Sequence, residues 1–436
     1  TDEKWLKTRD GGLDKPLNIY EIHAGSWRCK PDEEDQKDVA EHWYNYRELA
    51  DLLVPYLKEN HYHYVEMMPL AEHPSDESWG YQISGFFSPT SRYGTPDDLK
   101  YLVNKCHNAG IGVIMDFVPV HFAVDDYALW NFDGTALYEY PHGDVGKSEW
   151  GSCNFMHSRG EVRSFLQSAA DYWLEEFHFD GLRMDAISNL IYWQGNPARG
   201  ENKDAVQFLQ NLNSGLKARF PSALLIAEDS TARPNITTPV WSGGLGFDYK
   251  WSGGWTKDLL EYLSKDPIER KNYHDQLTMS MLYAYCEHYI LTLGSRDVGT
   301  LKDFADKLPG SEEQKNAQIR EAYAYMMLHP GCKMMAPDKD MPKELELFVK
   351  DLNNMYLAHP ALYQLDDEYD GFEWVQLMKY EENVIVFMRK TEKPEETILA
   401  VCNFAAIPYE NYNVGVPFAG KYKEIFNSDD KKYGGN

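Results

Sequence analysis

"GVIMDFV" (residues 112–118) is an almost continuous apolar run that contains a single charged residue, Asp116. Strands with this composition belong to parallel sheets that are covered on both faces, because neither face of the strand meets water. Seven further short runs of this kind recur along the chain, at 18–24, 64–70, 181–186, 224–229, 246–251, 289–294 and 332–337. The sequence therefore predicts eight parallel strands.

Amphipathic helices are predicted between these runs. In the segment 95–110, TPDDLKYLVNKCHNAG, Thr95 can cap a helix, Pro96 suits its first position and Gly110 can end it. In the segment 165–177, FLQSAADYWLEEF, large or small apolar residues recur every fourth position. Eight strand–helix units in succession predict an α/β fold, a (β/α)8 TIM barrel.

The character of the sequence changes after this repeat. Residues 17–358 are predicted to form the barrel, and 359–436 a small all-β C-terminal domain that is truncated. Within the latter, 371–390 and 397–416 are predicted to form strands joined by polar turns. Residues 1–16 resemble an N-terminal linker.

Composition excludes some classes of partner. The net charge of −26 argues against binding to nucleic acid and to anionic membranes, which need Lys and Arg. No apolar run is long enough to span a bilayer. The six scattered cysteines form no CxxC pair, so free thiols and a cytoplasmic location are expected. Oligomeric state stays open.

Charged residues gather where the predicted strands end. Asp116 and His121 follow the third strand, Arg183 and Asp185 the fourth, and Glu228 the fifth. Catalytic groups of a barrel lie at these ends. Retaining glycoside chemistry needs two carboxylates roughly 5–5.5 Å apart, and Asp185 and Glu228 on adjacent strands suit that need. The alternative is that buried Arg and Asp pair only to satisfy each other.

Aromatic residues follow the second strand. Trp79 and Tyr81 are placed to form a stacking wall against a glucose ring, although isolated aromatic residues are more often part of a core. No His/Cys cluster has the spacing of metal ligands. A mechanism with two carboxylates needs neither a metal nor an organic cofactor, and none is predicted.

The motifs SWGYQ…SPTSRYGTPDD, DFVPVHF, GLRMDA, IAEDST and GGLGFDYKW occur in this order. Together they resemble the α-amylase superfamily, glycoside hydrolase family 13, and within it the branching enzymes of glycogen biosynthesis. The resemblance implies a barrel, a small β domain, and a carbohydrate-binding β-sandwich that is missing before Thr1. It also implies retaining transfer of an α-1,4-glucan chain, from glycogen or amylose, to a 6-hydroxyl.

The same resemblance implies roles for individual residues. Asp185 matches the nucleophile and Glu228 the general acid/base. The other matches, which hold the nucleophile or the glucose at the cleavage site, are Arg183, Asp116, His121 and Tyr81.

The sequence departs from the branching-enzyme pattern at the ends of later strands. The family has LSHDEV after the seventh strand and this chain has LGSRDV, so that Ser295 replaces His and Arg296 replaces Asp. Ser252 and Gly253 replace Asn-Met, and the segment 334–348 lacks the family's FMGxEF and the loop beyond it. A guanidinium at this position opposes a positively charged transition state.

Three functions remain open on this basis. The first is a branching enzyme of impaired activity. The second is an inactive homologue that binds α-glucan or acts as a structural partner. The third is a relative with altered bond specificity. We expect little or no branching activity, with Arg296 as the main obstacle.

Overall fold

The computed structural model describes residues 1–31, 42–294, 301–336 and 341–435. Eight strands form a closed barrel in the order β1-β12-β11-β10-β9-β8-β5-β2, which confirms the predicted fold class. Each predicted apolar run contains one of them: β1 Asn18–Ile22, β2 Tyr64–Met67, β5 Gly112–Phe117, β8 Gly181–Met184, β9 Leu224–Ala227, β10 Tyr249–Trp251, β11 Tyr289–Leu293 and β12 Cys332–Met335.

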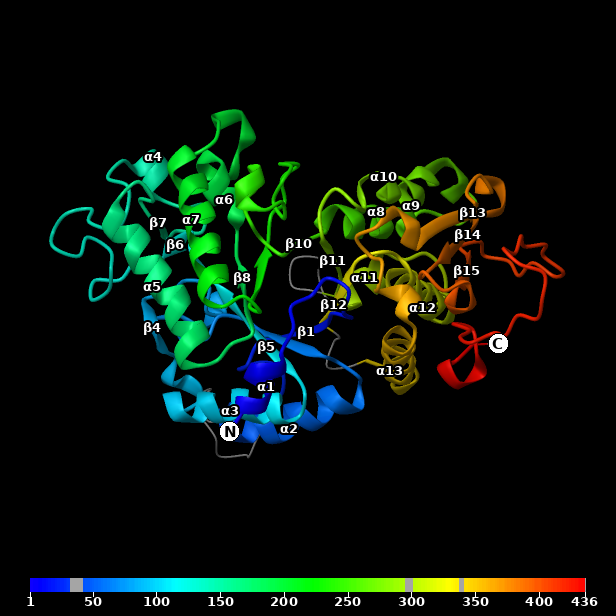
Figure 1. Cartoon of the computed structure of the whole chain (residues 1–436), viewed down its shortest axis with the longest axis horizontal. Helices are drawn as coiled ribbons and strands as arrows, with labels where there is room; N and C mark the ends of the chain where they lie inside the picture. The colour runs from blue at the N-terminus through cyan, green and yellow to red at the C-terminus, as the bar shows by residue number, and fades with distance from the viewer. Residues whose placement is uncertain (32–41, 295–300, 337–340, 436) are drawn as a thin grey trace. The chain divides into compact units, whose positions relative to one another are not determined.

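The chain divides into two compact units (Figure 1). Unit 1 comprises Thr1–Gly11, Tyr20–Lys58 and His63–Trp251, and unit 2 comprises Gly12–Ile19, Glu59–Tyr62 and Ser252–Asn436. The domain boundaries expected from the sequence, 17–358 and 359–436, stay a prediction.

The helices of unit 1 follow its strands, and α5 and α7 lie side by side (Figure 1). They are α1 Glu3–Thr8, α2 Tyr46–Glu59, α3 Pro96–Asn108, α4 Gly143–Gly146, α5 Gly160–Glu176, α6 Ile187–Ile191 and α7 Lys203–Arg219. The predicted start of α3 is confirmed: the Thr95 hydroxyl accepts from the backbone N–H of Asp98, and the Asp98 carboxylate accepts from that of Thr95. Gly110 follows the helix at φ +79°.

Two short antiparallel ladders lie between the barrel strands of unit 1. One pairs β3 (Ala71–Glu72) with β4 (Gly85–Pro89), and the other pairs β6 (His121–Phe122) with β7 (Cys153–Asn154). They fix the loops that follow the second and third barrel strands, and these loops carry several of the predicted site residues.

Unit 2 carries further helices and a separate antiparallel sheet. Its helices are α8 Gly253–Ser264, α9 Asp275–Thr278, α10 Ser280–Tyr283, α11 Leu301–Lys307, α12 Glu312–Leu328 and α13 Lys343–Ala358. The sheet has the order β13 (Phe372–Gln376), β14 (Val384–Arg389), β15 (Ile398–Asn403). Its strands confirm those predicted at 371–390 and at the start of 397–416.

The strand prediction is wrong for residues 404–416. The structure forms no strand there, nor in the remaining described residues up to 435. Pro408 and Pro417 have no backbone N–H to donate to a ladder, and Gly415 favours irregular backbone. The apolar residues of this stretch therefore extend no sheet.

The barrel strands are buried on both faces, as their composition predicts. All residues of β5, β8, β9 and β12 are buried.

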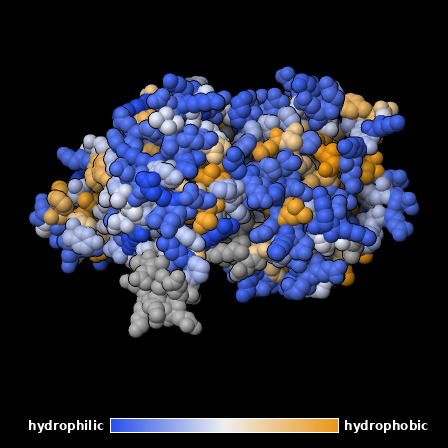
Figure 2. All heavy atoms as spheres, turned by 90° about the horizontal axis from the view of Figure 1, so that it is seen from below, coloured by the Kyte–Doolittle hydropathy of each residue, from blue (hydrophilic) through white to orange (hydrophobic). Residues whose placement is uncertain are grey.

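On the face shown in Figure 2, hydrophilic residues predominate and hydrophobic residues form small separate groups. Among the described residues, no helix has both the length and the apolar character needed to cross a membrane.

The N-terminal stretch expected to be a linker contains α1 and is anchored to unit 1 by Asp180, a buried residue just before β8. The Asp180 carboxylate accepts from Trp5 Nε1 at 2.7 Å and lies 3.0 Å from Arg9 Nη1. Its other oxygen lies 2.7 Å from His107 Nε2 and accepts from the backbone N–H of Val113 at 2.7 Å. One carboxylate thus ties four segments together.

We expect Asp180→Asn to lower the free energy of unfolding by about 3 kcal/mol, because an amide cannot accept from donors on both sides and leaves a buried cation uncompensated. Urea unfolding followed by tryptophan fluorescence measures this. The exposed Asp97→Asn is the control, and equal midpoints for the two variants would contradict the anchoring role.

Candidate active site

A buried arginine joins two carboxylates at the ends of neighbouring strands. Arg183 in β8 is 1% exposed, and its Nη1 lies 2.6 Å from Asp185 Oδ1 and 3.0 Å from Asp116 Oδ2. The guanidinium carbon lies 4.1 Å from the centre of the Trp251 ring. Burial alone would lower the pKa of Arg183, but the charges of Asp116 and Asp185 raise it well above its usual value. The group is therefore a fixed positive charge.

Strand register places this arginine beside its first partner. Asp116 in β5 and Arg183 in β8 are direct neighbours in the parallel ladder. The Tyr81 hydroxyl, from the loop between β3 and β4, donates a hydrogen bond to Asp116 Oδ2. Three residues that are distant in sequence are thus brought together, as expected from their places at strand ends.

Glu228 is bonded to the turn that directly follows Asp185. Glu228 Oε2 accepts from the backbone N–H of Ala186 at 2.7 Å, and the Glu228 carbonyl accepts from that of Ile187 at 2.9 Å. Ala186 has φ +50°, in the left-handed region, which costs a residue other than glycine roughly 1–2 kcal/mol. The strained turn therefore directs its N–H toward the Glu228 carboxylate.

His121 in β6 is a neutral ring. It is 3% exposed, and burial lowers its pKa to about 4, although the charge of Asp185 acts in the opposite direction. At pH 7 the imidazole therefore offers one donor and one acceptor.

Two exposed tryptophans lie on loops of unit 1, and one of them contacts His121. Trp79 is 43% exposed with its ring centre 6.2 Å from that of His23, and Trp150 is 44% exposed with its ring centre 5.2 Å from that of His121. Gln82 Nε2 donates to the Trp150 carbonyl at 2.9 Å. The sequence analysis missed Trp150, because only the pairing of β6 with β7 returns its loop to His121.

Asp229 serves a different contact from Glu228. Its Oδ2 accepts from Lys250 Nζ at 2.8 Å, and it also accepts from the Thr231 hydroxyl. The two adjacent acids, which follow the end of β9, thus make separate interactions.

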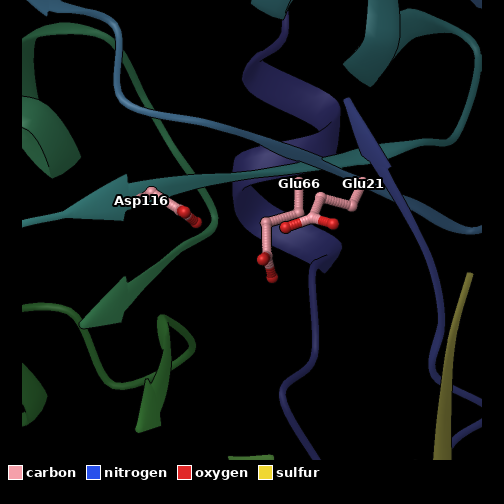
Figure 3. Close-up of side chains that lie close together, drawn as sticks. All are labelled: Glu21, Glu66 and Asp116. Carbon is pink, nitrogen blue, oxygen red and sulfur yellow. The ribbon is translucent and has the colours of Figure 1, made fainter. Parts of the chain in front are cut away.

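Three buried acids of unit 1, one of them Asp116 of the site, lie close together. Glu21 in β1, Glu66 in β2 and Asp116 in β5 each have a carboxylate oxygen within 4.8 Å of the others (Figure 3). In the part of the chain that the structure describes, this is the one group of His, Cys, Asp or Glu close enough to surround a cation. Arg183 already supplies positive charge to Asp116. The absence of a required metal or cofactor stays a prediction.

Comparison with known proteins identifies the family. Residues 51–131 match the family described as "Alpha amylase, catalytic domain", and 374–436 match "Alpha amylase, C-terminal all-beta domain". The chain is 44% identical to the 1,4-alpha-glucan branching enzyme GlgB of Fusobacterium nucleatum subsp. nucleatum, over 100% of this chain and 73% of that protein. The GlgB of Geobacillus stearothermophilus is 42% identical, over 100% of this chain and 71% of that protein. The chain belongs to the 1,4-alpha-glucan branching enzyme family.

This membership confirms the resemblance inferred from the motifs, including its place in the α-amylase superfamily. A crystal structure of an alpha-amylase from Geobacillus thermoleovorans complexed with acarbose superimposes with a TM-score of 0.68 at 17% identity, covering 91% of this chain and 88% of that chain. A likeness at this identity shows the barrel fold alone.

Two of the positions at which the chain departs from other branching enzymes, Ser295 and Arg296, lie outside the described residues. The strand that precedes them, β11, ends at Leu293. Ser252, another departure, precedes α8, and its backbone N–H donates to the Ile290 carbonyl at 2.9 Å. The catalytic and binding roles implied for the site residues stay predictions.

The state of His121 predicts a pH dependence of stability. Its pKa is lower in the folded chain, about 4, than the 6.5 of an unperturbed ring. The unfolded chain therefore takes up a proton that the folded chain refuses, and stability is lost as the pH falls from about 6.5 toward 4. At pH 5 this amounts to about 2 kcal/mol for this group.

We accordingly expect His121→Gln to lose about 2 kcal/mol less stability than the unmodified chain between pH 7 and pH 5. Denaturant unfolding at the two pH values measures the difference. The exposed His142→Gln is the control, and an equal pH dependence for all three proteins would show that His121 titrates normally.

Proposed function

We propose that the chain binds α-1,4-glucan and carries the reacting groups for retaining transfer of a glucan chain to a 6-hydroxyl, with impaired activity. The observation that carries the proposal is the junction of Asp185 and Glu228 through the N–H of Ala186, with Arg183 bonded to Asp185. Membership of the branching enzyme family supports the reaction type.

In the first half of the reaction, Asp185 attacks the anomeric carbon while Glu228 protonates the departing glycosidic oxygen. The bond from carbon to that oxygen breaks, and a covalent glucosyl ester forms on Asp185. Arg183, 2.6 Å from the Asp185 carboxylate, favours its ionised, nucleophilic form.

In the second half, a 6-hydroxyl of the acceptor glucan replaces the first product. Glu228, now ionised, takes the proton of this hydroxyl while its oxygen attacks the anomeric carbon. The ester bond breaks and Asp185 leaves as a carboxylate. Two displacements at the same carbon retain its configuration, and both carboxyl groups return to their starting states.

Other residues would hold the glucose ring. Tyr81 presents an aromatic face fixed by its hydrogen bond to Asp116. Asp116 and the neutral His121 offer hydrogen bonds to sugar hydroxyls. The exposed rings of Trp79 and Trp150 offer flat surfaces to neighbouring glucose units.

Impairment is proposed from the sequence at Ser295 and Arg296. Losing one preorganised electrostatic group costs on the order of 10²–10³ in rate. A guanidinium in place of a carboxylate also opposes the positive charge of an oxocarbenium-like transition state. The second candidate function, an inactive homologue that binds α-glucan, is favoured by the same two residues.

All six cysteines are free thiols, which supports the expected cytoplasmic location.

Incubation with amylose, followed by loss of iodine colour, tests the proposal. We expect the unmodified chain to show little or no branching. Replacing Ser295→His and Arg296→Asp together should raise the rate at least about 10-fold, short of full recovery because the segment 334–348 is also altered. Adding Asp185→Asn should abolish that gain.

Two results would count against this account. Strong branching by the unmodified chain would mean that another group does the work of the replaced carboxylate. No gain in a double variant that stays folded and binds amylose would place the obstacle elsewhere than Arg296.

Trp150 provides a separate test of glucan binding. We expect Trp150→Ala to weaken amylose binding about 10-fold, because a stacked ring contributes roughly 1–1.5 kcal/mol. Affinity electrophoresis or calorimetry measures this. Tyr369→Ala, which removes an exposed ring of unit 2, is the control, and equal affinities of both variants would exclude Trp150 from the binding surface.

A further inference from the structure

Glu66 occupies the inside of unit 1, behind the residues of the candidate active site. It lies in β2 and is 0% exposed. Figure 3 shows its carboxyl group close to that of Glu21 from β1, with Asp116 from β5 turned toward the same space. None of the reaction steps proposed above uses Glu66 or Glu21.

An ionised Glu66 would add negative charge beside a carboxylate that already has its counter-charge. Arg183 is shared by Asp116 and Asp185. Glu66, if it were also ionised, would lie within 4.8 Å of the Asp116 carboxylate, with no donor of the described residues bonded to it. Burying uncompensated charge costs several kcal/mol per ion, so a buried acid in such a place keeps its proton instead.

The surroundings of Glu66 single it out as the neutral member. Both of its carboxyl oxygens are buried, and no donor of the described residues bonds to either. An ionised carboxylate without donors is among the least favourable buried groups, whereas a protonated carboxyl carries its own donor. The carboxylates of Glu21 and Asp116 each have an oxygen within 4.8 Å of an oxygen of Glu66 and can accept from it.

Electrostatics agree with this assignment. Burial, followed by the charge of Asp116, raises the pKa of Glu66 well above its usual 4.5, and Glu21 adds to the effect. Arg183 opposes the shift without cancelling it. These are the charged groups that face Glu66 from β1, β5 and β8.

We infer that Glu66 keeps its proton in the folded chain and donates it to Asp116 in a hydrogen bond. Glu66 is then a positioning residue. It braces the carboxylate that binds Tyr81 and Arg183 without adding a further negative charge, and through Arg183 it supports the orientation of Asp185. The consequence for glucan rests on the proposed function, but the protonation of Glu66 does not.

Infrared spectroscopy tests the protonation directly. At pH 7 we expect the unmodified chain to show the carbonyl stretching band of protonated carboxylic acids, and Glu66→Gln to show a weaker band, because Glu321, whose pKa burial raises to about 8, also contributes to it. The exposed Glu161→Gln should keep that band and lose a carboxylate band instead. Loss of a carboxylate band in Glu66→Gln would overturn the inference.

The pH dependence of stability gives a second readout. Above pH 4.5 the unfolded chain releases the Glu66 proton while the folded chain retains it, so this group's contribution to stability is lost as the pH rises toward its folded pKa. The unfolding equilibrium constant of the unmodified chain, relative to Glu66→Gln, should therefore rise about tenfold per pH unit above about pH 5. A ratio that stays constant between pH 5 and pH 8 would overturn the inference.

Amylose binding distinguishes a role of Glu66 in positioning Asp116 from a role in folding alone. Glu66→Gln keeps a donor for Asp116 and should bind amylose as the unmodified chain does. Glu66→Leu is similar in size but has no donor, and it should bind about 10-fold more weakly while circular dichroism shows that it remains folded. Equal binding by the two folded variants would exclude the positioning role. If the unmodified chain does not bind amylose, the proposed function fails while the infrared result still decides the protonation.

Discussion

The ion pairs of Arg183 with Asp116 and Asp185 are the constraint on which the rest of the site depends. A guanidinium that is 1% exposed is tolerated in a barrel interior only if well-placed carboxylates offset the free-energy cost of removing its charge from water. The parallel register supplies one of them, since Asp116 and Arg183 are ladder neighbours. The second comes two residues further along the same strand end. A one-residue slip of β8 against β5 would turn Arg183 toward the opposite face of the sheet and unpair all three groups.

The turn after β8 connects the buried ion pairs to Glu228, the second candidate catalytic carboxylate. Asp185 follows the buried arginine by two residues, and Ala186 adopts a left-handed backbone that an alanine would otherwise avoid. The two backbone hydrogen bonds that involve Glu228 offset this strain. Strain of this kind persists where the surroundings over-determine the backbone. Strand pairing fixes the position of Asp185, and the turn after it fixes the position of Glu228 at the end of the next strand.

The sequence predicted what depends on local pattern. Eight apolar runs were enough to predict eight barrel strands, and Thr95 with Pro96 was enough to predict the start of α3. Because catalytic groups of a barrel lie at strand ends, the sequence also predicted that one site contains Asp116, Arg183, Asp185 and Glu228. Glu66 was missed because the sequence of a four-residue strand does not show toward which face an acidic side chain points. Trp150 was missed because the position of its loop depends on the pairing of β6 with β7. Residues 404–416 were misread, since apolar content alone provides neither a partner strand nor backbone donors.

Binding and turnover depend on different physical terms in such a site. We propose that a neutral sugar binds here through hydrogen bonds and apolar contact with a neutral His121, the ring of Tyr81 and exposed indoles. A distant charge changes such contacts little. The chemical step instead creates positive charge at the anomeric carbon and is sensitive to each fixed charge nearby. At position 296 the chain has an arginine where the family pattern has an aspartate, which reverses the sign of the charge carried by that residue. A chain of this composition is therefore expected to retain glucan recognition while its catalysis declines, because only the second is an electrostatic property of the transition state.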